Sequence, residues 1–254
     1  MKNMAREITI IKFGGSLSLD AAAKARFLKD IKSIETGGGS AVLVHGGGRE
    51  VTAWLQKLGI KNRFINGLRY TDEKTLEVVE MVLSGIVNRR LILELNNAGV
   101  KAVGISGKDA GMVICKRIKK LGFVGEPSRI DSKLINTLIN NGFVPVLSSI
   151  CSGTDGRTLN VNADSIAMAL AIKLKARRLV LLTDVRGVLD RQNKTIPRIR
   201  PVEVNGLISS GIITGGMIPK IKSCVKSVRS GVKEVWIADG RKGLRKLEGT
   251  VIIK

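Results

Sequence analysis

Two glycine-rich segments of the sequence could bind an anion through their backbone N–H groups. They are KFGGS at residues 12–16 and HGGG at residues 45–48, and each directly follows an apolar run. Glycine allows positive φ and close approach of a ligand, so successive N–H groups can point at one anion. A helix that begins after such a loop adds the partial positive charge of its N-terminus. One glycine-rich turn is commonplace, but the pair predicts a phosphate-binding crevice at the ends of two strands.

Two lysines stand beside glycine-rich segments. Lys12 ends an apolar run, and Lys220 follows GGM at residues 215–217, where a helix is expected to begin. Burial of an ammonium group costs several kcal/mol unless an anion is nearby, and a lysine in the first turns of a helix opposes the helix dipole. A bound phosphate would offset both costs. The alternative for Lys12 is a strand-end lysine whose ammonium group reaches solvent.

Three polar residues, Asn160, Asn162 and Asp164, alternate just before an expected helix at 165–176. One interpretation is helix capping by Asn162 or Asp164, which is a frequent role for these residue types. The functional interpretation is that Asp164 orients lysines while the asparagines bind a polar substrate. The residues alone leave both interpretations open.

Several nucleotide-binding and catalytic motifs are missing from the sequence. It contains neither G-x-x-x-x-G-K-[ST] nor a helix-opening G-x-G-x-x-G, which excludes a P-loop and argues against a Rossmann dinucleotide site. The protein-kinase signatures are also missing. His45 is the one histidine, so a Ser-His-Asp triad would depend on it alone and is not predicted.

Apolar runs alternate with amphipathic runs along the chain, which predicts a mostly parallel sheet covered by helices. Strands are expected at 7–13, 41–44, 143–150 and 178–185, and helices at 20–35, 50–58 and 73–97. Asn66-Gly67 is a turn signal, and Asp72 could cap the helix at 73–97. A lobe boundary is expected near Ala176.

The composition is that of a globular protein: 254 residues, 44% hydrophobic and 25% charged. No apolar run approaches the ~20 residues that span a bilayer, and residues 1–7 lack the features of a signal peptide. We therefore expect a cytoplasmic protein without a membrane partner. The three cysteines are far apart, and we expect reduced, mostly buried thiols.

The formal net charge is +22, from 43 Lys and Arg against 21 Asp and Glu. Such a balance suits an anionic partner, and nucleic acid has to be considered. However, aromatic residues make up only 3% of the chain, so few side chains are present on which nucleic-acid bases could stack. We expect anionic small-molecule substrates rather than nucleic acid.

Six segments, in this order and spacing, resemble the amino acid kinase family. They are KFGG (12–15), HGGG (45–48), NGLR (66–69), NVNAD (160–164), TDV (183–185) with Gly187, and GGMIPK (215–220). The resemblance covers nearly the whole chain and is greatest with the branch that phosphorylates N-acetyl-L-glutamate. It implies an α/β three-layer sandwich around a mostly parallel central sheet, in two lobes. Residues 1–176 would bind the acceptor and dimerise, and residues 177–254 would bind ATP.

The resemblance also implies a role for each matching residue. Lys12 and Lys220 would contact the phosphoryl group in transfer, and Asp164 would hold both lysines in place. Arg69 would bind the α-carboxylate of N-acetyl-L-glutamate, a task that suits its bidentate guanidinium. The remaining expected contacts are Gly46, Gly47, Asn160 and Asn162 for the acceptor, and Gly14, Gly15, Asp184, Gly215, Met217 and Lys220 for the nucleotide.

The expected reaction transfers the terminal phosphoryl group of ATP to a side-chain carboxylate and makes an acyl phosphate. A carboxylate is already ionised near pH 7, so no general base is required. Mg²⁺ would arrive with ATP, held by phosphates and water, and no protein metal site is expected.

Two other functions stay open from the sequence. A sister kinase could act on aminoadipate or glutamate carried on an acidic protein, and a nucleic-acid-binding or regulatory protein could use a kinase-like scaffold. Arginine-inhibited relatives carry an additional N-terminal helix that links dimers into hexamers. Only about seven residues precede the first expected strand here, so we expect a homodimer without arginine feedback.

Overall fold

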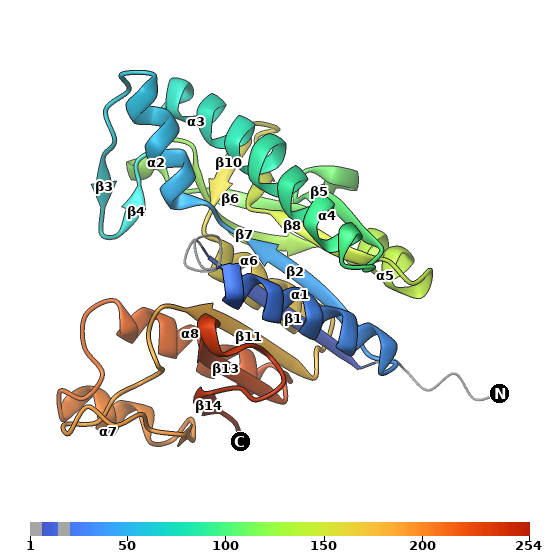
Figure 1. Ribbon diagram of the computed structural model, residues 1–254. Helices are drawn as coiled ribbons and strands as arrows, with labels where there is room; N and C mark the ends of the chain where they lie inside the picture. Colours follow the sequence, from blue (N-terminus) through green and yellow to red (C-terminus); the bar gives the residue numbers. More distant parts are fainter. Residues whose placement is uncertain (1–6, 15–20) are drawn as a thin grey trace. The chain divides into compact units, whose positions relative to one another are not determined.

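The computed structural model describes residues 7–14 and 21–254, which fold into two compact units (Figure 1). Unit 1 consists of the described residues up to Ala41 together with Leu170–Lys254, and unit 2 is Val42–Ala169. This division differs from the expected single boundary near Ala176. The first strand groups with the C-terminal part of the chain because it pairs there, with Thr9 opposite Arg178.

The sheet of unit 1 is mostly parallel. Its strand order is β12 (Arg198–Ile199), β14 (Gly249–Ile252), β13 (Glu234–Asp239), β11 (Arg178–Thr183) and β1 (Ile8–Phe13). All its pairings are parallel except the one between β13 and β14. Every residue of β11 after Arg178 is buried, as expected for a strand whose two faces are both covered.

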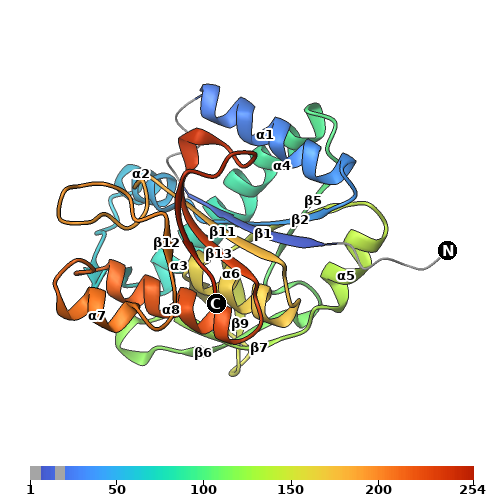
Figure 2. The same cartoon turned by 90° about the horizontal axis from the view of Figure 1, so that it is seen from below.

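Helices cover both faces of this sheet. Figure 2 shows α1 (Ala21–Thr36) on one side of β1, β11 and β13, and α8 (Met217–Arg229) on the other. The shorter elements of unit 1 are α7 (Val204–Ser209) and the 3₁₀ turn η4 (Gly240–Lys242), and α6 (Ala163–Lys173) runs from unit 2 into unit 1. The predicted α/β class with a mostly parallel sheet and helical layers is confirmed.

Unit 2 contains a second set of parallel strands, β2 (Ser40–His45), β8 (Val144–Ser148) and β5 (Ala102–Ser106). Next in the unit is a small closed barrel of β10 (Thr158–Val161), β7 (Val124–Ile130), β6 (Val113–Arg117) and β9 (Ile150–Gly153). The hairpin of β3 (Phe64–Ile65) and β4 (Leu68–Arg69) turns at Asn66 and Gly67, both with positive φ, of 49° and 78°. This pattern is a type I′ turn, so the Asn-Gly signal predicted it correctly.

The helices of unit 2 pack over these strands. They are α2 (Gly48–Lys57), α3 (Glu73–Glu80), α4 (Asn88–Asn97) and α5 (Lys133–Asn140), with the 3₁₀ turns η2 (Asp109–Gly111) and η3 (Lys119–Leu121). A π-helical turn, η1 (Met81–Val87), joins α3 to α4 into one continuous helix. The expected long helix at 73–97 is therefore present, and Asp72 caps it by accepting a 2.8 Å hydrogen bond from the N–H of Thr75.

The hydrophobic core of unit 2 includes Val51 and Leu55 of α2, Val78 of α3, Leu83 of η1 and Ile150 of β9. Helix packing of this kind holds α2 against the long helix. The three cysteines, Cys115, Cys151 and Cys224, are buried free thiols, as expected. Among the described residues, no helix is both long and apolar enough to cross a membrane.

Candidate acceptor and nucleotide sites

A cavity of about 210 Å³ lies within unit 2, at the glycine-rich end of β2. Its walls include the glycine loop, the β3–β4 hairpin, the stretch that leads from β10 into α6, and side chains of α2, α3 and η1. Its lining residues include Gly46, Gly47, Gly48, Phe64, Arg69, Leu83, Asn160, Asn162 and Ala163. All five residues that the sequence assigned to the acceptor therefore line one cavity.

The glycine loop is closely packed against its neighbours. A Cβ atom on Gly47 would lie 2.7 Å from Cδ2 of Leu83 in the π-helical turn, so no larger side chain fits without movement. A Cβ on Gly46 would lie 3.9 Å from Cβ of Ala163, at the start of α6. Gly47 has a φ of 166°, which is extended backbone, so packing rather than backbone strain requires glycine there.

Arg69 is held in a fixed orientation by three hydrogen bonds. Its Nη2 donates to the carbonyl of Gly48 and to Oγ1 of Thr52, both at 3.0 Å, and its Nη1 donates to Oδ1 of Asn62. A guanidinium carries five N–H donors, so two are left after these bonds. These bonds hold the guanidinium in one orientation, so Arg69 has lost most of its rotamer freedom before any ligand binds.

The surroundings of Arg69 are only partly polar. Arg69 is 9% exposed, and its guanidinium carbon lies 4.8 Å from the ring centroid of Phe64, which is a cation–π distance. Burial lowers the pKa of Arg69 below its ordinary value. A guanidinium stays protonated at neutral pH even so, and a buried cation that retains unused donors is a strong site for an anion.

The two asparagines of the NVNAD segment differ in their bonding. Nδ2 of Asn160 donates to Oγ1 of Thr71 at 3.1 Å, and that hydroxyl donates to the carbonyl of Arg69 at 3.0 Å. Oδ1 of Asn162 accepts hydrogen bonds from the N–H groups of Asp164 at 2.8 Å and Ser165 at 3.4 Å. Asn162 is thus a helix cap as well as a cavity residue, and the two interpretations of this segment are compatible.

His45 lies at the end of β2, next to the glycine loop, and is 1% exposed. Burial lowers its pKa to about 4, with a further contribution from the nearby charge of Arg89. The imidazole is therefore neutral at neutral pH. Its Nδ1 donates to the carbonyl of Gly46 at 2.9 Å, and its Nε2 accepts from Nδ2 of Asn88 at 3.0 Å.

The residues assigned to the nucleotide lie in unit 1, with Gly15 outside the described residues. Lys12 and Gly14 are at the carboxyl end of β1, and Lys12 pairs in register with Leu181 of β11. Its Nζ would lie 3.4 Å from a Cβ placed on Gly14, so the ammonium group is close to the glycine loop. The adjacent strand β11 ends at Thr183, and Asp184 follows it. The carboxyl ends of two neighbouring parallel strands thus supply these residues.

The third nucleotide segment begins α8. Gly215 has a φ of 51°, in the region that favours glycine, and Met217 is the first residue of the helix. Lys220 follows within the first turns, where the helix dipole disfavours a cation. Asp164 lies in the first turn of α6, in unit 2. No group of three or more His, Cys, Asp or Glu side chains suited to a metal ion occurs among the residues that the structure describes.

Sequence reasoning missed several residues at the cavity of unit 2. Asn62 and Thr52 hold Arg69, Phe64 stacks on it, and Thr71 links it to Asn160. Thr71 lies two residues after Arg69 in the sequence, so its closeness to NGLR was a usable signal. Nothing in the spacing of Thr52 could have placed it beside Arg69.

Comparison with known proteins places this chain among kinases of small molecules. The model of the amino acid kinase family matches residues 7–239. An acetylglutamate kinase of Endomicrobium trichonymphae is 51% identical over 248 residues, which are 98% of this chain and 99% of that protein. One from Campylobacter fetus subsp. fetus (strain 82-40) is 44% identical over 237 residues, 92% of this chain and 85% of that protein. The crystal structure of smu.665 from Streptococcus mutans UA159 has a TM-score of 0.85 and 33% identity, and the match covers 97% of this chain and 98% of that one.

Proposed function

The chain belongs to the amino acid kinase family, and we propose that Arg69 and the glycine loop of β2 bind the amino-acid acceptor of its reaction. It catalyses ATP-dependent phosphorylation of the side-chain carboxylate of N-acetyl-L-glutamate, a reaction of arginine biosynthesis. A carboxylate oxygen bonds to the γ-phosphorus, and the bond from that phosphorus to the bridging oxygen of ADP breaks. ADP leaves with the electron pair.

The observation that carries the acceptor assignment is the position of Arg69 within the cavity of unit 2. A buried guanidinium with two unused donors fits the α-carboxylate of the substrate. Asn160 and Asn162, which line the same cavity, would offer amide groups to the rest of the polar substrate. Gly46 and Gly47 then supply N–H groups on the side of the cavity where β2 ends.

For phosphoryl transfer, we propose the roles that the family resemblance implies. Lys12 and Lys220 neutralise the charge on the transferred group, Asp164 orients the two lysines, and Gly14 and Gly15 contact the phosphates. Asp184, Gly215 and Met217 help to bind the nucleotide. The barrier is the approach of a negative nucleophile to a negative phosphoryl group, so positive groups and positioning supply most of the catalysis.

The proposed cofactor is Mg²⁺ bound to ATP, because Mg²⁺ usually keeps several waters and is held largely by substrate phosphates. Unit 2 would bind the acceptor and unit 1 the nucleotide. We also propose a cytoplasmic homodimer, and analytical ultracentrifugation would test the dimer. A sedimenting monomer or hexamer would contradict it.

The reaction is tested by trapping its product. The protein is incubated with Mg-ATP, hydroxylamine and a panel of acidic amino acids that includes N-acetylglutamate, glutamate, aspartate and aminoadipate. Hydroxylamine converts acyl phosphates to hydroxamates but leaves phosphate esters intact, so the signal reports both the acceptor and the bond type. Hydroxamate is expected with N-acetylglutamate. A signal only with another acid of the panel, or ADP release without hydroxamate, would overturn the assignment.

A further inference from the structure

We propose that His45 is a positioning residue that orients the peptide bond between Gly46 and Gly47 toward the acceptor cavity. This inference rests on the proposed acceptor site, but it concerns a side chain that does not itself line the cavity. His45 would act through the glycine loop, without touching a substrate or transferring a proton.

The hydrogen bonds around the imidazole fix its tautomer. Nδ2 of Asn88 can only donate, and it lies 3.0 Å from Nε2 of His45. The same Nδ2 donates to the carbonyl of Val146 at 2.9 Å, while Oδ1 of Asn88 accepts from Nη2 of Arg89 at 2.6 Å. Both ends of the amide are thereby assigned, so Nε2 of His45 must accept and the ring proton must lie on Nδ1.

The Nδ1 proton in turn fixes the glycine loop. Nδ1 lies 2.9 Å from the carbonyl oxygen of Gly46, which draws that oxygen toward the imidazole. No cis peptide bond occurs in the described residues, so the N–H of Gly47 points away from the Gly46 carbonyl. Within the described part of the chain, no backbone carbonyl accepts a hydrogen bond from the N–H of Gly47.

The N–H of Gly47, a residue that lines the cavity, therefore points away from the buried histidine. Preorganised N–H donors of this kind stabilise charge that develops during a transfer step. The network around His45 is also built into the fold: Asn88 is fully buried, and a Cβ on Gly104 of β5 would overlap the side chains of Asn88 and Arg89. Three elements, β2, α4 and β5, thus keep one peptide bond in a single orientation.

Two amide substitutions separate the proposed role from simple core filling. His45→Asn places an amide N–H near the position of Nδ1 and can still donate to Gly46. His45→Gln places its amide near Nε2, so it keeps the partner Asn88 but loses the donor to Gly46. The two side chains have similar polarity. If His45 only filled the core, both variants should therefore lose similar activity.

The experiment measures kcat and KM for N-acetylglutamate, with thermal unfolding to confirm that both variants fold. We expect His45→Gln to lower kcat about tenfold or more, and His45→Asn to retain several times more activity than His45→Gln. Equal losses, or a greater loss for His45→Asn, would overturn the proposal. Because wild-type activity is measured alongside, failure of the reaction itself is distinguished from failure of the histidine's role.

The second measurement needs no substitution. His45 is the one histidine of the chain, so the ¹⁵N spectrum of the labelled native protein contains a single imidazole. We expect a protonated Nδ1 and an unprotonated Nε2 at neutral pH. A proton on Nε2 in that spectrum would overturn the proposal even if the variants failed to fold.

Discussion

Single residues of unit 1 test the proposed phosphoryl transfer most directly. Lys12→Ala or Lys220→Ala should lower kcat about 10²-fold or more, because the proposed mechanism uses each ammonium group to stabilise charge on the transferred phosphoryl group. Lys222→Ala is the matched control: it lies on the same helix as Lys220, is exposed, and should leave kcat unchanged. Steady-state kinetics with saturating ATP and acceptor measure the effect. Unchanged kcat in either of the first two variants would contradict the assigned role.

Arg69 should affect binding rather than the chemical step. Arg69→Lys keeps the charge but loses the bidentate guanidinium and its bonds to Gly48, Thr52 and Asn62, so KM for N-acetylglutamate should rise about tenfold or more. Asn62→Ala should raise the same KM by a smaller factor, because it frees Arg69 without removing it. The exposed Asn136→Ala serves as control. If KM stays constant in Arg69→Lys, the carboxylate is bound elsewhere.

The buried imidazole of His45 also makes stability depend on pH. The unfolded chain protonates His45 near pH 6.5, whereas the folded pKa is about 4, so the unfolded state binds more protons below pH 6.5. The free energy of unfolding should therefore fall as the pH drops from 6.5 toward 4, by roughly 2 kcal/mol at pH 5. His45→Asn lacks this contribution. Urea unfolding of both proteins at pH 7 and pH 5 should show the difference between them shrinking or reversing on acidification, and a constant difference would refute the folded pKa.

At the scale of elements, the π-helical turn η1 shapes the acceptor cavity. It brings Leu83 so close to the glycine loop that Gly47→Ala would place a methyl group 2.7 Å from Cδ2 of that side chain. Because the φ of Gly47 suits any residue, the expected defect is steric, and Gly47→Ala should lower kcat/KM about tenfold or more. Truncation of Leu83 to alanine should then restore part of the lost kcat/KM.

The matching experiment compares Gly47→Ala with the double variant Gly47→Ala/Leu83→Ala. Recovery in the double variant relative to both single variants identifies the contact as the cause. Gly206→Ala in α7 is the control, since nothing lies within 4 Å of a Cβ at that position. A double variant that is no better than the sum of both single losses would point to damage beyond this contact.

Local signals predicted the elements better than the contacts between them. The Asn66-Gly67 turn, the Asp72 cap and the glycine loop before α2 each follow from adjacent residues, and each is present in the structure. The strand β1 could not be assigned to its unit from its own residues, because it pairs with β11 about 170 positions later in the chain. The π-helical turn and the tethering of Arg69 by Asn62 and Thr52 likewise depend on tertiary packing, which periodicity does not encode.

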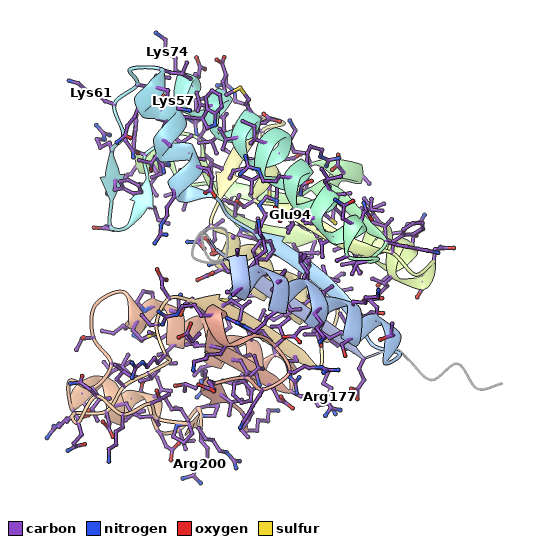
Figure 3. The ribbon with its side chains drawn as sticks, viewed as in Figure 1. Lys57, Lys61, Lys74, Glu94, Arg177 and Arg200 are labelled. Carbon is purple, nitrogen blue, oxygen red and sulfur yellow. The ribbon has the colours of Figure 1, made fainter. Side chains whose placement is uncertain are left out.

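At the scale of the whole molecule, the question is whether the net charge of +22 contributes to substrate binding. Some of the surface cations are paired, as Arg177 is with Glu7 and Arg200 with Glu203. In contrast, Figure 3 shows Lys61 and Lys74 projecting from the end of unit 2 that carries the β3–β4 hairpin, where α2 ends and α3 begins. That hairpin forms part of the acceptor cavity, so exposed cations gather on the same end of the unit as the binding residues.

Both substrates are anions, and a positive surface raises their local concentration near the site at low ionic strength. The Debye length falls from about 30 Å at 0.01 M salt to about 8 Å at 0.15 M, so added salt should weaken this attraction. We expect kcat/KM for N-acetylglutamate to fall severalfold over that range, mainly through KM, while kcat changes little. Lys61→Gln/Lys74→Gln should have a shallower salt dependence than wild type. Arg177→Gln/Arg200→Gln removes the same charge from paired positions and should follow the wild-type curve. Identical curves for all three proteins would show that the charge at this end of unit 2 does not attract the acceptor.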